Sequence, residues 1–438
     1  MNKIKILLII TIILAILLPI LQLGLINSFL LILLCYLILI MLFNPKLGLF
    51  LLIIIRPCAD ILQNQTAQIY NIAVNFSYLL GIIAVFFSIA IIIKYHQKLK
   101  TIPLLSQISL FLFIALISCF TSINTTISFV EYIRLSSIFL LYFAGYLLIN
   151  TKQDLARFIK IIILSSIIPC AFAFYQLYTN TGLNVPFEGV YNRILGTFSH
   201  PNLFAYYLII PITLSVLLLL ISDKKKTLNI FLIALLPIFT ILLLLTYTRG
   251  AWLALLIIIL LIGIIKYRKL LLITFVCCLF IYFTIEPINL RVNNTFSDKY
   301  DSISWRIELW KDSLKYARQK IILGYGTGTA EELILQKRGH QFGSTASHND
   351  YIKIFLENGL LGLILYLSII ISLLFQLFKN YISLNQPSLK ILTLIIIGIT
   401  FALLTGSFID NILRNTALQW IYWVLLGGFL FKNNRPVA

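Results

Sequence analysis

Long runs of apolar residues alternate with short polar segments along the whole chain. Each run is close to the roughly 20 apolar residues that an α-helix needs to cross the hydrocarbon core of a bilayer. Fourteen spanning helices are predicted, and because Arg56 and Pro57 interrupt the third run, twelve to fourteen is the predicted range. The predicted helices are 4–25, 28–43, 47–62, 72–93, 103–120, 128–149, 157–178, 201–221, 228–246, 250–265, 269–285, 350–378, 389–408 and 416–431. The pattern therefore predicts an all-α, polytopic membrane protein.

The composition excludes a water-soluble fold. Hydrophobic residues make up 60% of the 438 residues and charged residues 11%, whereas soluble domains have roughly 45–50% and 25%. The first apolar run lacks a small-residue cleavage site, so we expect a retained helix and not a signal peptide. A net charge of +19 would suggest a nucleic-acid partner in a soluble protein. Here we expect the lipid bilayer as partner and no nucleic acid.

The basic residues explain the net charge and predict an orientation. Every second connection between the predicted helices is basic, as expected for cytoplasmic loops. These connections contain Lys46, Lys94, Lys98, Lys100, Lys152, Arg157, Lys160, Lys224, Lys225, Lys226, Lys266, Arg268, Lys269, Lys379, Lys390, Lys432 and Arg435. The N-terminus is therefore predicted to be cytoplasmic.

One connection on the predicted outer side is large, at residues 286–348. Within it, apolar residues recur at alternating spacings of four and three, which is typical of an amphipathic helix that lies on a membrane or closes over a site. The stripe comprises Ile303, Ile307, Trp310, Leu314, Ala317 and Ile321. Asp301 and Ser302 are suitable caps, and Gly324 is expected to end the helix. The chain thus divides into helices at 1–285, an outer loop at 286–348 and further helices at 349–438.

The short outer loops and helix ends contain basic residues that break the positive-inside rule, and all of them are arginine. They are Arg56, Arg134, Arg193, Arg249 and Arg414. Guanidinium offers a rigid fork of donors for bidentate phosphate binding, whereas an ammonium is a point charge. We therefore expect an anionic ligand on the outer side.

Arg249 and Arg193 are the sharpest cases. Arg249 lies in a turn too short to leave the outer membrane surface, and the alternative is an arginine that snorkels from a helix end. Arg193 comes shortly before a helix whose free N–H groups attract anions, and the alternative is a solvated loop. His200, beside it, is expected to be an interfacial histidine.

His348 is a candidate general base. Ser347 and Asp350 resemble a capping box, which would place His348 in the first turn of the helix that follows. A helix N-terminus disfavours imidazolium, so this histidine would stay neutral and able to accept a proton. The alternative is a histidine that merely ends a loop. For Arg306, in the outer loop, sequence chemistry alone favours a solvated helix face.

Other signals indicate no metal or nucleotide chemistry. The glycines at 324–328 follow a helix and lack the Gly-Lys-Ser/Thr of a nucleotide loop. The carboxylate pairs Asp298/Asp301 and Glu331/Glu332 are spaced like solvated charges, and Glu131 is expected to pair with Arg134. The six cysteines have no metal-ligand spacing. We therefore expect no cofactor and no metal.

Several weak motifs follow one another in a fixed order. They are Arg193, Gly196-Thr197-Phe198, Pro201-Asn202, Thr248-Arg249-Gly250-Ala251-Trp252, Arg306, Trp310, Leu323-Gly324-Tyr325-Gly326, His348-Asn349-Asp350-Tyr351 and Glu357-Asn358-Gly359-Leu360-Leu361-Gly362. This ordered set, over roughly residues 190–375, resembles the O-antigen ligase and polymerase superfamily.

The resemblance implies a GT-C-like membrane glycosyltransferase in a bacterial inner membrane. It implies an undecaprenyl-diphosphate-linked glycan as donor and a metal-independent, inverting transfer to an acceptor hydroxyl. Carried over by residue, Arg249 and Arg306 would bind the diphosphate, Arg193 would assist, and His348 would activate the acceptor.

The acceptor stays open at this point. Lipid A core (a ligase), the growing glycan (a polymerase) and a protein hydroxyl are the alternatives, with the ligase preferred because the family label covers it. A glycan transporter or flippase is the alternative outside the enzyme class. It is disfavoured because the charges cluster at helix ends and not near the bilayer midplane.

Overall fold

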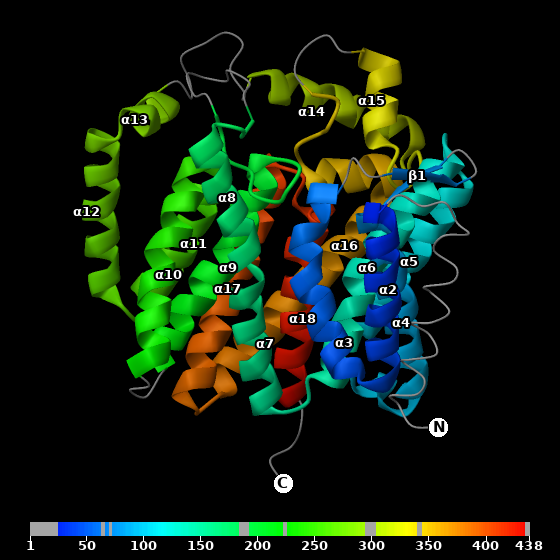
Figure 1. The fold of residues 1–438 in the computed structure, drawn as a ribbon. Helices are drawn as coiled ribbons and strands as arrows, with labels where there is room; N and C mark the ends of the chain where they lie inside the picture. The colour runs from blue at the N-terminus through cyan, green and yellow to red at the C-terminus, as the bar shows by residue number, and fades with distance from the viewer. Residues whose placement is uncertain are drawn as a thin grey trace.

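The computed structural model describes residues 25–62, 66–69, 72–183, 192–221, 226–293, 304–339 and 344–433. The first predicted helix, at 4–25, therefore lies almost entirely outside the described residues. The remaining residues form a bundle of roughly parallel and antiparallel helices (Figure 1).

The bundle helices occur at the predicted places. They are α2 (Leu25–Phe43), α3 (Pro45–Ile55), α4 (Phe76–Lys94), α5 (Leu105–Phe120), α6 (Thr125–Leu148), α7 (Lys152–Ser165), α8 (Ile167–Thr179), α9 (Pro201–Ile221), α10 (Lys226–Leu245), α11 (Arg249–Ile265), α12 (Arg268–Thr284), α16 (Asp350–Ser383), α17 (Pro387–Ile409) and α18 (Thr416–Asn433). By length and composition, seven described helices can cross a membrane, or up to eight if the bent pair of α12 and α13 (Glu286–Asn293) is one span, and four shorter helices are also apolar. The predicted class, an all-α polytopic membrane protein, is confirmed.

Local chemistry explains where the helices depart from the predicted bounds. The helix predicted from residue 72 begins at Phe76, because Asn75 caps it and the preceding residues form a hairpin of β1 (Thr66–Ile69) and β2 (Ile72–Asn75). The run predicted as one helix at 157–178 breaks at Ser166 into α7 and α8. Pro169 lacks an N–H, which removes a hydrogen bond inside a helix but none in the first turn of a new one.

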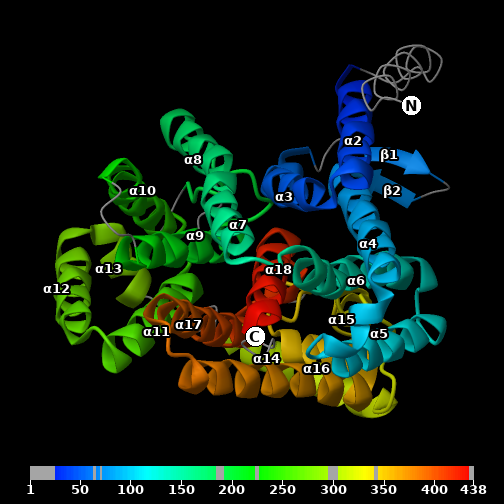
Figure 2. The same ribbon diagram turned by 90° about the horizontal axis from the view of Figure 1, so that it is seen from below.

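Helices α9, α17 and α18 form the centre of the bundle. Most residues of the membrane-length windows of α9 and α17 are buried, and α18 is surrounded by the other helices in the view along the bundle (Figure 2). By contrast, α12 has no buried residue and stands at the edge. The core therefore lies among α6, α9, α17 and α18, away from α12.

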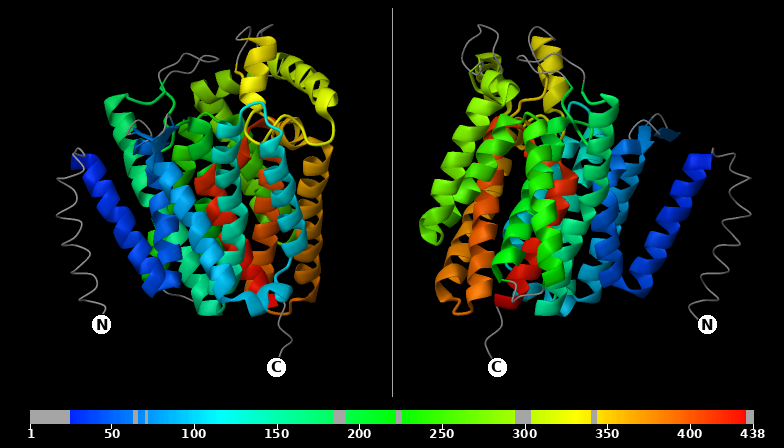
Figure 3. Two further views of the ribbon diagram at one scale, coloured as in Figure 1. Left: turned by 90° about the vertical axis from the view of Figure 1, so that its right-hand side faces the viewer. Right: turned by 60° about the vertical axis from the view of Figure 1, so that its left-hand side comes forward.

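The two ends of the bundle differ. Helices α13, α14 (Ser304–Ala317) and α15 (Ala330–Arg338) lie together over one end (Figures 1 and 3). The connections from α4 to α5, which includes η2 (His96–Thr101), from α6 to α7, from α11 to α12 and from α16 to α17 lie at the other. Lysines that the sequence pattern assigned to one side of the membrane lie in or close to these four connections. The loop predicted at 286–348 contributes α13 to α15.

The amphipathic helix of this loop is α14, and its predicted caps Asp301 and Ser302 lie outside the described residues. Leu309 and Ala317 are buried toward the protein, together with Ser313. Of the predicted apolar stripe, Ile307 and Leu314 are 43% and 37% exposed. The stripe is therefore split, and part of it faces away from the bundle.

Helix α16 is broken at Gly359, whose φ is 65° and ψ −168°. This conformation is essentially restricted to glycine. At the break, the N–H of Leu360 donates to the carbonyl of Ile321 at 2.7 Å. The kink therefore ties the long helix to the end of the bundle where α14 and α15 lie.

Candidate functional site

A cavity of about 610 Å³ opens at the end of the bundle covered by α13 and α14. Arg193, Arg249, Arg306 and His348, the four residues singled out as site candidates, all line it. The rest of the described lining is Leu183, His200, Asn202, Tyr206, Tyr247, Thr248, Gly250, Leu253, Arg291, Trp305, Ile409 and Asp410. Four distant segments of the chain thus bring the candidates together.

Arg193 is buried and held from several sides. Its backbone pairs with Leu183 in an isolated antiparallel bridge. Its Nε donates to the carbonyl of Thr246 at 2.8 Å, and its Nη2 donates to Oδ1 of Asn202 at 2.9 Å and to Oγ1 of Thr248 at 3.1 Å. Arg193 as a whole residue is 5% exposed. Its guanidinium is therefore fixed in place, and the alternative of a solvated loop arginine is wrong.

Arg249 is the first residue of α11, with Thr248 as the N-cap. Its Nη1 donates to the carbonyl of Arg291 at 3.3 Å. Arg291, on α13, is itself buried and donates from Nε to the carbonyl of Tyr247 at 3.4 Å. Two guanidinium groups from different helices therefore meet on one side of the cavity.

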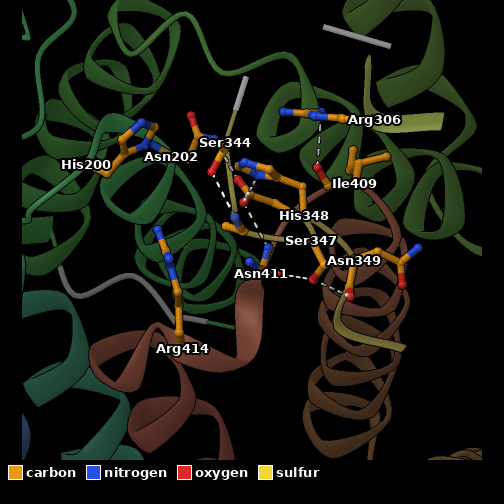
Figure 4. A network of polar contacts seen from close by, with 12 residues as sticks. His200, Asn202, Arg306, Ser344, Ser347, His348, Asn349, Ile409, Asn411 and Arg414 are labelled. Atoms are coloured by element: carbon orange, nitrogen blue, oxygen red, sulfur yellow. Dashed lines mark hydrogen bonds and ion pairs between the residues drawn. The ribbon is translucent and has the colours of Figure 1, made fainter. Parts of the chain in front are cut away.

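Arg306 reaches the cavity from α14. Its Nη1 donates to the carbonyl of Ile409 at 3.2 Å (Figure 4), at the C-terminal end of α17, where a cation is favoured by the helix dipole. Its guanidinium carbon lies 5.5 Å from the ring centroid of Trp305. The solvated face expected from sequence chemistry alone is wrong for this side chain, because α14 lies over the cavity.

The predicted helical position of His348 is wrong. Asn349 and not Ser347 caps α16, since its Oδ1 accepts from the N–H groups of Tyr351 and Ile352, both at 3.0 Å. His348 precedes the helix with a φ of 46°. The first-turn argument for a neutral imidazole therefore does not apply, and the surroundings of the ring decide its chemistry.

Those surroundings centre on Asp410, which follows α17. Nδ1 of His348 lies 3.2 Å from Oδ1 of Asp410, and Nδ2 of Asn202 donates to Oδ2 of Asp410 at 2.6 Å. Because Asn202 also accepts from Arg193, one chain of polar contacts joins Arg193 to His348. Figure 4 shows His348 between Arg306 and Asn411, with His200 and Asn202 facing it.

The carboxylate of Asp410 is held in its charged form. Burial alone would raise its pKa, but the hydrogen bond and charge of His348, the charge of Arg306 and the amide of Asn202 hold the pKa below its ordinary range. A carboxylate at this place orients the His348 ring.

His200 is held neutral. Burial and the neighbouring charge of Arg193 lower its pKa to about 4, and Arg414 and His348 act in the same direction. Its Nδ1 accepts from the backbone N–H of Asn202 at 3.1 Å. This acceptor role is compatible with a neutral ring that fixes the segment carrying Asn202.

Tyr206, on α9, lines the cavity with a hydroxyl that has no hydrogen-bond partner among the described residues. The residue is 1% exposed. It packs against two glycines, since a Cβ at Gly250 would lie 2.5 Å from its Oη and one at Gly406 2.8 Å from its Cε1. A buried hydroxyl without a partner costs about 1–3 kcal/mol, and a ligand in the cavity would recover that cost.

Left-handed backbone gathers around this cavity. Of the five non-glycine residues with positive φ in the described chain, Tyr247 and His348 line the cavity, and Asn192 directly precedes Arg193. Such conformations cost about 1–3 kcal/mol each and are concentrated at functional sites.

The other predicted outer arginines lie elsewhere. Arg56, Arg134 and Arg414 line a second cavity of about 370 Å³. As expected, Arg134 pairs with Glu131, which accepts from its Nε at 2.6 Å. The predicted arginine set thus divides between two cavities.

Arg291, Asp410 and Tyr206 were missed from the sequence. No pattern in the sequence distinguishes Arg291 or Tyr206. The one signal available for Asp410 was its position as a lone carboxylate at the outer end of an apolar helix. Within the described residues, no group of three His, Cys, Asp or Glu side chains is arranged to hold a metal ion.

Comparison with known proteins bears on this arrangement. No curated protein matches the chain. The family described as O-Antigen ligase matches residues 230–367, which include Arg249, Arg291, Arg306 and His348 and leave Arg193 and Asp410 outside. Residues 230–367 are therefore similar to the O-antigen ligase family, in agreement with the resemblance of the ordered motifs.

Proposed function

We propose that this protein is a membrane glycosyltransferase that moves a glycan from undecaprenyl diphosphate to an acceptor hydroxyl, with lipid A core as the acceptor. The observation that carries the proposal is the convergence of Arg193, Arg249, Arg306 and His348 on one cavity. The similarity of residues 230–367 to the O-antigen ligase family supports the reaction class.

The charges of the cavity suit a diphosphate. Its described lining contains four arginines and, as its acid, Asp410. Guanidinium groups form bidentate, charge-assisted bonds with phosphate oxygens. As the glycosidic bond breaks, negative charge develops on the leaving diphosphate, and preorganised cations lower the barrier most where charge develops.

His348 is proposed as the general base. With an Nδ1–H directed at Asp410, Nε2 is the nitrogen that accepts the proton of the acceptor hydroxyl. The acceptor oxygen forms a bond to the anomeric carbon from the face opposite the diphosphate, and the bonding pair leaves with the diphosphate. The configuration at the anomeric carbon is inverted, no metal takes part, and Asp410 stabilises the proton on His348.

The proposed setting is the bacterial inner membrane, with the N-terminus in the cytoplasm. The cavity lies at the end of the bundle opposite the lysine-rich connections, which the positive-inside rule assigns to the cytoplasm. The residues at 286–348 then form the outer loop between the helices of 1–285 and those of 349–438, and the donor reaches the cavity from the outer leaflet.

The test uses purified protein in liposomes with undecaprenyl-diphosphate-linked glycan and lipid A core. The wild-type protein is expected to form glycosylated lipid A core and free undecaprenyl diphosphate. His348→Ala is expected to bind the donor as the wild type does and to lose transfer by at least about 100-fold, the loss of a general base.

Each contrary outcome has a meaning. Extension of the donor glycan alone would identify a polymerase, and transfer to a protein would identify a protein glycosyltransferase. Movement of the donor between leaflets without formation of a glycosidic bond would identify a flippase and overturn the proposal. Normal transfer by His348→Ala would remove this residue from the mechanism.

A further inference from the structure

The second cavity lies on the other side of a wall that it shares with the first. Ser199 and Leu203 line the second cavity, while His200 and Asn202 between them line the first. In the same way Asp410 faces the first cavity and Arg414 and Thr416 the second. The remaining described lining is Arg56, Asp60, Asn75, Ser77, Tyr78, Gly81, Ile82, Val130, Ile133, Arg134, Ser137 and Trp420.

One part of the second cavity is polar and aromatic. Oδ1 of Asp60 accepts from Nη1 of Arg56 at 2.9 Å and from the hydroxyl of Ser77 at 2.8 Å. Arg56 also donates to Thr416 and lies 5.8 Å from the ring centroid of Trp420. A carboxylate, several hydroxyls and aromatic rings together provide acceptors, donors and stacking surface for a sugar.

The arginines of this cavity are compensated. Arg56 pairs with Asp60 at 2.9 Å, Arg134 pairs with Glu131, and Nη1 of Arg414 lies 3.2 Å from Oε1 of Glu331. A carboxylate partner for each guanidinium leaves little positive charge for a diphosphate. The chemistry therefore fits a neutral, hydroxyl-rich group better than a second copy of the donor's anionic end.

The other part of the cavity is apolar and has room. Its walls come from α4 and α6, with Gly81 and Ile82 on one side and Val130 and Ile133 on the other. A Cβ placed on Gly81 would have no atom within 4 Å, although the glycine is buried. Tyr78, on the same helix, is 38% exposed. The cavity thus combines a polar head region with an apolar region, as an amphiphile requires.

From these observations, and resting on the proposed function, we infer that the second cavity binds the sugar end of the membrane-anchored acceptor. The acceptor approaches between α4 and α6, its apolar part beside Gly81 and its hydroxyls near Asp60, Ser77 and Thr416. The wall formed by Ser199–Leu203 and Asp410–Thr416 then lies between the bound part of the acceptor and the donor. The reacting hydroxyl extends past this wall into the first cavity, where His348 and the donor lie.

Gly81 allows a steric test. Gly81→Leu fills open space without a clash at Cβ, and Gly81→Ala is the matched control that leaves most of the space free. In the liposome assay with lipid A core, we expect Gly81→Leu to raise the KM for the acceptor at least tenfold and to leave the KM for the donor within twofold. Gly81→Ala fills less of the space, so it is expected to raise the acceptor KM less than Gly81→Leu does and to leave the donor KM within twofold. Asp60→Asn, which keeps the shape of the side chain, is expected to raise the acceptor KM severalfold.

The outcomes separate this inference from the proposed function. The acceptor site would be overturned if Gly81→Leu left the acceptor KM unchanged, or if it raised the acceptor and donor KM equally. Either result would leave the proposed transferase function unaffected. If the wild type fails to transfer, the proposed function falls, and direct binding of lipid A core to wild type and Gly81→Leu in nanodiscs still tests the cavity. A phospholipid retained by the wild type and lost in Gly81→Leu, with unchanged acceptor binding, would overturn the inference.

Discussion

Arg193, Asn202, Asp410 and His348 form a continuous set of polar contacts in which each side chain contacts the next. Two kinds of residue can be distinguished here. Arg249, Arg306 and His348 are proposed to touch the substrates, whereas Asn202 and Asp410 act through the position and charge of His348. Substitution of a residue that touches the substrates should therefore affect transfer differently from substitution of a residue that positions His348.

Arg249→Lys is expected to reduce transfer by about 10²- to 10³-fold, the loss typical of one removed donor to a developing anion. Lysine keeps the charge but loses the planar fork that holds two phosphate oxygens. The measurement is kcat in the liposome assay. Arg268→Lys, at an exposed position where α12 begins, is the matched control and should keep wild-type turnover. Wild-type turnover in Arg249→Lys would refute its role.

The unpartnered hydroxyl of Tyr206 can be tested against the hydrogen-bonded hydroxyl of the adjacent Tyr207. Tyr206→Phe removes a hydroxyl without a described partner, so the protein should be no less stable, while transfer should fall about tenfold with the loss of one hydrogen bond to the substrate. Tyr207→Phe removes a bond to Ser165 of 2.8 Å and should lower the free energy of unfolding by about 0.5–1.5 kcal/mol with unchanged transfer. Thermal unfolding measures the stability of each variant, and kcat/KM measures transfer. Unchanged transfer in Tyr206→Phe, with a loss of transfer in Tyr207→Phe, would remove Tyr206 from the site.

The sequence predicted the residues of the site better than their arrangement. Arg193 and Arg249 stand out because the basic residues of the short outer loops and helix ends were all read as arginine, and His348 stands out because a helix follows it. The partnership of His348 with Asp410 joins residues 62 positions apart, and nothing local in the sequence indicates it. The capping prediction failed because Asn349 competes with Ser347 for the free N–H groups of α16, and asparagine is as good a cap.

At the scale of elements, apolar runs predicted the described helices because the bilayer dictates their length and composition. What the runs could not predict is the irregular structure between them. The hairpin of β1 and β2 and the 3₁₀ helix η1 (Arg56–Leu62) depend on contacts with the rest of the molecule, such as that of Arg56 with Thr416. These irregular elements contribute part of the second cavity, which periodicity alone cannot indicate.

The kink in α16 is a further element that depends on one residue. Gly359→Ala forces a side chain into a backbone with φ 65°, where its Cβ would lie 2.2 Å from the carbonyl oxygen of Ile322. We expect the free energy of unfolding to fall by about 1–3 kcal/mol or more, measured by thermal or denaturant unfolding in detergent. Gly81→Ala, which meets no atom within 4 Å, should be neutral or stabilising by up to about 1 kcal/mol. Equal stability of the two variants would show that the kink is not required.

At the scale of the whole molecule, stability should depend on pH through His200. Its pKa is about 4 in the folded protein against an ordinary value of 6.5, so between these values the unfolded chain binds more protons. Stability is therefore full above about pH 6.5 and falls as the pH is lowered toward 4, by an amount on the order of 1–3 kcal/mol. Arg193, Arg414, His348 and Asp410 are the charged or titratable neighbours involved.

The measurement is the unfolding temperature in detergent at pH 7 and pH 5, for wild type and His200→Gln. The variant has no imidazole to protonate, so its unfolding temperature should change less between the two pH values. An equal change in both proteins would assign the pH dependence to other groups.

The wall between the two cavities has a consequence for the order of events. Asp410–Thr416 and Ser199–Leu203 each contribute side chains to both cavities, so a shift of either segment on binding one substrate alters the site of the other. Linkage then requires reciprocity: if the donor changes the affinity for the acceptor by some factor, the acceptor changes the affinity for the donor by the same factor. Cooperativity between donor and acceptor binding would thus depend on these two short segments.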